Sequence, residues 1–113
     1  MTDFDDASLD VTPEQAAQAL ADGSAEVIDV REQYEWDAGH IEGVRHIVLG
    51  SLQGAADTID RDRPVIFQCK SGARSTMAAQ AFRSAGYRAF NLDGGIDQWV
   101  AEGRPISGQV AAH

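Results

Sequence analysis

The feature that most constrains the fold is a short apolar run that leads into the only cysteine of the chain. The run occupies residues 65–67, with Gln68 between it and Cys69, and an Ala-rich segment with helical spacing starts at Ser75. A short, partly β-branched run of this kind is typical of a buried strand. We therefore predict a strand, a loop that carries Cys69, and a helix from Ser75 to about residue 85.

A cysteine in such a loop is placed to act as a nucleophile. Where a strand turns into a helix, unpaired backbone N–H groups converge on one point and favour an anion. Lys70 and Arg74 add positive charge beside Cys69. The alternative is a small, inert, buried apolar residue, but Lys, Ser, Gly and Arg are poor neighbours for such a niche. We therefore expect Cys69 to be reactive and mainly thiolate at neutral pH.

The rest of the chain alternates strand and helix signals. Thr12, Pro13 and Gln15 form a capping box with proline at the first helical position, and Gly23 ends that helix. β-Branched and apolar runs bounded by turn residues supply the strands. We predict strands at 8–11, 26–30, 44–47, 65–67 and 87–92, helices at 13–22, 50–59, 75–85 and 96–101, and a helical turn at 32–38.

This alternation predicts an α/β fold with a central, mainly parallel sheet of about five strands and helices on both faces. A chain of 113 residues suffices for one core. We expect a flexible acidic segment at residues 1–7, a single domain at 8–106 and a flexible tail at 107–113. In such a sheet, ligands bind at the carboxyl ends of the strands, where Cys69 lies.

Composition excludes several classes of function. The formal net charge of −9 argues against nucleic acid as a partner. A single cysteine cannot form an intramolecular disulfide or a multi-thiolate metal site, so a reducing compartment fits best. The first residues are acidic and lack an apolar leader, and no run is long enough to span a membrane. We expect a cytoplasmic protein that does not bind or span a membrane and that needs no metal or organic cofactor.

Several motifs together resemble the rhodanese family of sulfurtransferases. The loop Cys69-x-x-Gly72-x-Arg74-Ser75 is similar to the active-site loop of that family. The other matching motifs follow in the family's order over residues 8–106: Asp29-Val30-Arg31-Glu32, Gly39-His40-Ile41-x-Gly43, Leu92-Asp93-Gly94-Gly95 and Gly103-Arg104-Pro105. Each motif alone is weak, but their joint occurrence is specific.

The resemblance implies a set of site residues. Cys69 is the implied nucleophile, and the implied substrate-binding loop consists of Lys70, Ser71, Gly72, Ala73, Arg74 and Ser75. It also implies that Asp29, Arg31 or Glu35 lies near the loop, where a carboxylate would hold Arg74 by a bidentate pair. The alternative is that these three residues and Glu32 serve only as capping and turn residues with exposed ion pairs, each contributing about 0–1 kcal/mol. His40 is interpreted as a structural residue rather than a general base.

Three function classes remain open. The first is transfer of sulfane sulfur from thiosulfate or a similar small anion through a Cys69 persulfide to cyanide or a thiol, which a thioredoxin-like protein could carry. The second is a non-catalytic sulfur carrier or protein-binding module. The third is a phosphatase or arsenate reductase, but related phosphatases have five residues between cysteine and arginine. Four residues separate Cys69 from Arg74, so the ring of N–H groups is narrower and suits one sulfur atom better than a tetrahedral phosphate.

Overall fold

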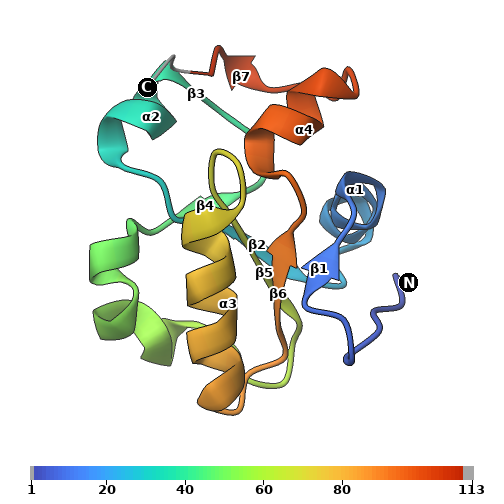
Figure 1. The fold of residues 1–113 in the computed structure, drawn as a ribbon, viewed down its shortest axis with the longest axis vertical. Helices are drawn as coiled ribbons and strands as arrows, with labels where there is room; N and C mark the ends of the chain where they lie inside the picture. The colour runs from blue at the N-terminus through green and yellow to red at the C-terminus, as the bar shows by residue number, and fades with distance from the viewer. Residues whose placement is uncertain (1, 111–113) are drawn as a thin grey trace.

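The computed structural model, which describes residues 2–110, has a five-stranded parallel sheet at its centre (Figure 1). The strand order is β1-β6-β5-β2-β4, so β5 is the middle strand. This arrangement confirms the predicted α/β class and the parallel sheet. The strands of this sheet are β1 (Asp10–Val11), β2 (Glu26–Asp29), β4 (Arg45–His46), β5 (Val65–Gln68) and β6 (Ala89–Leu92).

The middle strand β5 begins with three apolar residues, because both faces of the sheet are covered. Val65 and Phe67 of β5 point into one core cluster, whereas Ile66 between them points into the other. All three residues have no exposed surface. Alternating side chains therefore build two cores from a single strand.

Helices α1 (Pro13–Asp22) and α4 (Gly95–Ala101) cover one face of the sheet, and α3 (Ala73–Ser84) covers the other (Figure 1). The side of α3 also contains two 3-10 segments, η1 (Leu49–Ser51) and η2 (Gln53–Thr58). These segments replace the α-helix predicted at 50–59. Their glycines, Gly50 and Gly54, weaken α-helix formation.

The helix ends follow local sequence signals. The predicted capping box of α1 is present, because Thr12 Oγ1 accepts from Gln15 N–H and Gln15 Oε1 accepts from Thr12 N–H. Helix α3 begins at Ala73, two residues before the predicted start. Its N-cap is Gly72, whose φ of 118° lies in the region that favours glycine. Arg74 and Ser75 therefore belong to the first turn of α3.

A second, two-stranded sheet was not predicted from the sequence. Strand β3 (Gly39–His40) pairs antiparallel with β7 (Ser107–Gly108). Strand β7 lies in the segment 107–113 that was expected to be a flexible tail. Residues 111–113 of that segment lie outside the described residues. At the other end, the Phe4 ring stacks on Phe90 at 5.3 Å between centroids. Contacts of the fold therefore extend beyond the predicted limits of 8 and 106. Among residues 2–110, no helix is long and apolar enough to cross a membrane.

Candidate active site

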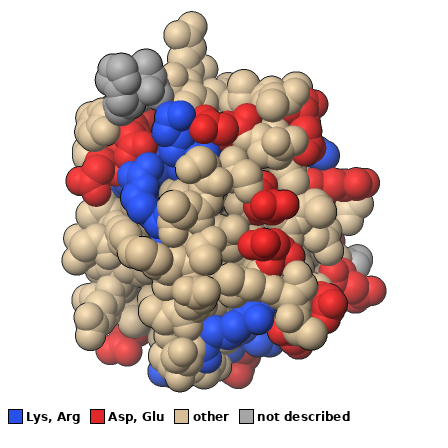
Figure 2. Space-filling view, in the orientation of Figure 1, with Lys and Arg blue, Asp and Glu red and all other residues tan. Residues whose placement is uncertain are grey.

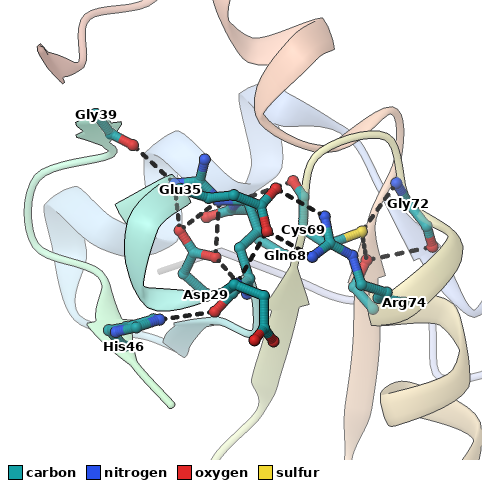
Figure 3. Close-up of polar contacts among 11 residues, drawn as sticks. Asp29, Glu35, Gly39, His46, Gln68, Cys69, Gly72 and Arg74 are labelled. Carbon is teal, nitrogen blue, oxygen red and sulfur yellow. Dashed lines mark hydrogen bonds and ion pairs between the residues drawn. The ribbon is translucent and has the colours of Figure 1, made fainter. Parts of the chain in front are cut away.

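Cys69 lies at the carboxyl end of the middle strand, in the loop between β5 and α3 (Figure 3). Its side chain is buried, with 1% of the residue exposed. The surroundings of its sulfur are nevertheless polar. Gly72 N–H donates to Cys69 Sγ at 3.1 Å, and Ser75 Oγ lies 3.2 Å from the same atom. The buried sulfur thus has two hydrogen-bonding partners.

The start of α4 holds the Cys69 loop in place through two backbone hydrogen bonds. The N–H groups of Ile96 and Asp97 donate to the carbonyl oxygens of Cys69 and Lys70 at 2.9 and 3.0 Å. A Cβ atom at Gly95 would lie 2.4 Å from the Lys70 carbonyl oxygen, and the φ of Gly95 is +60°. Only glycine permits this approach. Gly95 of the Gly94-Gly95 pair therefore lets the start of α4 pack directly against the Cys69 loop.

Arg74 is held by Glu35, as the sequence suggested for one of three candidate residues. Arg74 Nη1 donates to Glu35 Oε1 at 2.7 Å, and Nη2 donates to Oε2 at 2.9 Å. This bidentate pair joins α2 (Gln33–Ala38) to the first turn of α3. The Arg74 guanidinium lowers the pKa of Glu35, and Glu35 in turn raises the pKa of Arg74.

This ion pair should make stability depend on acid pH. The pKa of Glu35 is lower in the folded state than in the unfolded chain, so the stabilisation is complete above the unfolded value near 4.5 and is lost as pH falls through the folded value. Glu35→Gln keeps the size and the capping contact with Glu32 N–H but removes the charge.

We expect Glu35→Gln to lower the free energy of unfolding by about 1–2 kcal/mol at pH 7, and the difference from wild type to shrink below about pH 4. Urea titrations at several pH values measure both quantities. A difference that stays constant down to pH 3 would contradict the role of the charge.

Asp29 and Arg31, the other two candidates, pair with each other. Both side chains have no exposed surface, and Arg31 Nη2 lies 2.8 Å from Asp29 Oδ2. The same nitrogen donates to the Gly39 carbonyl oxygen at 2.8 Å (Figure 3). This buried pair fixes the segment that carries Glu35. The structure therefore places Asp29 and Arg31 behind Glu35, and Glu35 in contact with the loop.

Lys70, the second basic residue of the loop, also has an acidic partner. Its Nζ lies 3.0 Å from Asp97 Oδ2, and its side chain is about one-third exposed. The two loop cations are thus both paired on an acidic protein. Figure 2 shows the general pattern on one face, where basic side chains occur in small groups beside acidic ones.

His40 and His46 each contact a backbone carbonyl oxygen rather than the Cys69 loop. His40 Nδ1 lies 2.9 Å from the Trp36 carbonyl oxygen, and its ring stacks on the Trp36 indole at 3.7 Å between centroids. His46 Nε2 lies 2.8 Å from the Arg31 carbonyl oxygen (Figure 3). Within residues 2–110, no group of three or more His, Cys, Asp or Glu side chains is arranged to hold a metal ion.

One residue of the site was missed from the sequence. Asn91 of β6 is buried, and its Oδ1 lies 2.5 Å from Ser75 Oγ. In the sequence, Asn91 is one polar residue within a strand, and no local pattern indicates its proximity to Cys69. Only the pairing of β5 with β6, which sets Phe67 opposite Asn91, brings it there.

Comparison with known proteins agrees with this architecture. The family model of the rhodanese-like domain matches residues 12–102. The chain is 38% identical over 88 residues to the thiosulfate sulfurtransferase GlpE of Pseudomonas fluorescens (strain SBW25), covering 77% of this chain and 81% of that protein. It is 42% identical over 76 residues to the uncharacterized protein YqhL of Bacillus subtilis (strain 168), covering 66% of this chain and 60% of YqhL.

A solved structure shows the same fold. The crystal structure of a rhodanese-related protein from Thermoplasma volcanium has a TM-score of 0.80 and 25% sequence identity, and the match covers 88% of this chain and 98% of that one. The motifs, the parallel sheet with its cysteine loop and these relatives lead to one assignment. The chain belongs to the family of rhodanese-like domains.

Proposed function

We propose that this protein is a sulfurtransferase of the thiosulfate sulfurtransferase type, with Cys69 as the nucleophile. The observation that carries the proposal is the polar setting of a buried sulfur, which has Gly72 N–H at 3.1 Å at the end of the middle strand. The name of the relative GlpE, thiosulfate sulfurtransferase, supports the same chemistry.

The proposed reaction is a double displacement. The Cys69 thiolate attacks the outer sulfur of thiosulfate, an S–S bond forms to Sγ, and the S–S bond of the donor breaks with its electron pair leaving on sulfite. Cyanide or a thiolate then attacks the outer sulfur of the persulfide, and Cys69 leaves as a thiolate. No external oxidant or reductant enters this sequence.

The loop residues have distinct proposed roles. Gly72 N–H stabilises negative charge on the sulfur, while Arg74, braced by Glu35, fixes the loop in the geometry that receives one sulfur atom. Lys70, Ser71 and Ala73 complete the loop wall. The accepting thiol belongs to a small molecule or to a thioredoxin-like protein. We also propose a cytoplasmic location.

Steady-state assays on the same preparation test this function. We expect turnover with thiosulfate and cyanide, measured as thiocyanate formed, and no turnover with an aryl phosphate. Cys69-dependent hydrolysis of the aryl phosphate without thiocyanate formation would overturn the proposal in favour of phosphate chemistry.

The two loop cations should differ in their effects. Arg74→Lys keeps the charge but loses the planar fork that grips Glu35, so we expect the kcat for thiocyanate formation to fall about tenfold. Lys70→Ala should mainly raise the KM for thiosulfate. Arg88→Lys is the matched control, because Arg88 pairs with exposed Asp6 away from the loop. Equal, small effects of Arg74→Lys and Lys70→Ala would show that only net charge matters.

A further inference from the structure

A chain of three polar side chains extends from the sulfur of Cys69 to the edge of the sheet. Ser75 Oγ lies 3.2 Å from Cys69 Sγ and 2.5 Å from Asn91 Oδ1. Asn91 Nδ2 donates to Asp10 Oδ1 at 2.9 Å. Ser75 and Asn91 are buried, and Asp10 is exposed. The sulfur is thus connected to a surface carboxylate on β1.

The Ser75 hydroxyl has one proton and three possible acceptors. Asn91 Oδ1 at 2.5 Å is at the short end of O–H···O distances, the Gly72 carbonyl oxygen at 3.3 Å is long for such a bond, and Cys69 Sγ at 3.2 Å is at an ordinary distance for the larger sulfur atom. A hydroxyl donates a single hydrogen bond, and the short contact is the strong one. The proton of Ser75 therefore points to Asn91, and an oxygen lone pair faces Cys69 Sγ.

Asp10 determines which end of the Asn91 amide faces Ser75. Asp10 and Asn91 are directly paired residues of parallel strands β1 and β6. A carboxylate only accepts hydrogen bonds, so it takes the amide Nδ2–H and leaves Oδ1 on the side of Ser75. If the amide were reversed, its oxygen would face the carboxylate and its N–H group would face Ser75, which could then donate to the sulfur.

We propose that Asp10 and Asn91 are positioning residues that keep the Ser75 proton away from Cys69 and so leave the thiolate less stabilised. A Cys69 thiol can donate to the Ser75 lone pair, whereas a thiolate cannot. For sulfur transfer, which rests on the proposed function, a less stabilised thiolate attacks the donor better and leaves the persulfide more slowly. The chain thus favours loading of sulfur over its discharge.

Other charges around the loop act on Cys69 as well, so a variant that removes one of them, such as Asp10→Ala, needs a charge control. On α3, Arg74 lies close enough to Cys69 for a direct electrostatic interaction, and it is paired with a carboxylate of α2. The other charged groups around the loop are Lys70 in the loop itself, Glu35 on α2, Asp97 at the start of α4, Asp29 and Arg31 at the end of β2, and Asp10 on β1.

The test uses the pH dependence of Cys69 alkylation by iodoacetamide, followed by intact mass. The chain has one cysteine, so the signal is specific, and the midpoint of the profile does not depend on access to the sulfur. We expect Asn91→Leu, which keeps the branched shape but removes the amide, to lower the midpoint by about one pH unit, because Ser75 can then donate to the thiolate. Asp10→Ala, at an exposed position, should shift it in the same direction.

The Ser75→Ala background separates this hydrogen-bond effect from simple loss of charge. Asp93→Ala is the charge control, because it removes an exposed charge near the end of β6. In the Ser75→Ala background, Asn91→Leu and Asp10→Ala should lower the alkylation midpoint by no more than this control does. Ser75→Ala alone should change the midpoint little.

Two results would overturn the proposal: a raised midpoint for Ser75→Ala with no change for Asn91→Leu, or equal shifts with and without Ser75. Neither result depends on thiocyanate formation. A failure of sulfur transfer and a failure of this positioning role are therefore distinguished.

Discussion

Cys69→Ser should abolish thiocyanate formation from thiosulfate and cyanide to the level of the uncatalysed reaction. A serine hydroxyl at this position is not appreciably ionised at neutral pH, and it cannot carry sulfane sulfur as a persulfide. In the proposed reaction both half-reactions pass through Cys69 Sγ, so no other group of the loop should compensate. Steady-state rates of wild type and variant, measured at equal protein concentration, check this expectation.

The fold should survive this substitution. Serine is of similar size, and the Gly72 N–H that donates to Sγ at 3.1 Å can donate to the hydroxyl oxygen as well. Thermal unfolding should therefore stay cooperative, and loss of activity in a folded variant identifies the nucleophile. Turnover above background in the serine variant would remove Cys69 from that role.

A glycine inserted after Gly72 should reduce thiocyanate formation about a hundredfold. The insertion raises the number of residues between Cys69 and Arg74 from four to five, the length in phosphatases of related fold. It lengthens the link between Gly72 and Arg74, so the Gly72 N–H at the sulfur and Arg74 at Glu35 should no longer keep their relative positions, and shifts of about 1 Å in such groups can cost about a hundredfold in rate.

The same insertion tests the loop as a selector of substrate. The wider ring of N–H groups should admit phosphate or arsenate, measured as hydrolysis of an aryl phosphate or as inhibition by the oxyanion. A glycine inserted after the exposed Asp62, in the charged turn before β5, is the matched control and should leave both activities as in wild type. Unchanged sulfur transfer in the loop variant would contradict the geometric argument.

Much of the fold could be predicted because local signals and tertiary structure agree. Thr12 and Gln15 form the expected capping box, and the run Val65–Gln68 is the expected buried strand. Glu35 could be included among three candidates because the resemblance to the rhodanese family implied that Asp29, Arg31 or Glu35 lies near the Cys69 loop. Local sequence could not choose among the three, since the choice depends on how α2 turns toward the loop.

The parts that could not be predicted depend on contacts between distant segments. Asn91 reaches Ser75 only through the register of β5 and β6, and Asp10 reaches Asn91 only through the register of β1 and β6. The pairing of β3 with Ser107–Gly108 joins segments far apart in the chain. The 3-10 segments at 49–58 arise where two glycines weaken an α-helical pattern, and the pattern alone does not give the alternative geometry.

We propose that Cys69 carries sulfur as a persulfide, and intact-mass spectrometry after brief exposure to thiosulfate detects this intermediate. We predict a mass increase of one sulfur atom that maps to the peptide containing Cys69, disappears on addition of cyanide, and is absent in Cys69→Ser. A folded wild-type protein that forms thiocyanate without ever gaining this sulfur, or that gains it equally in the serine variant, would contradict the account.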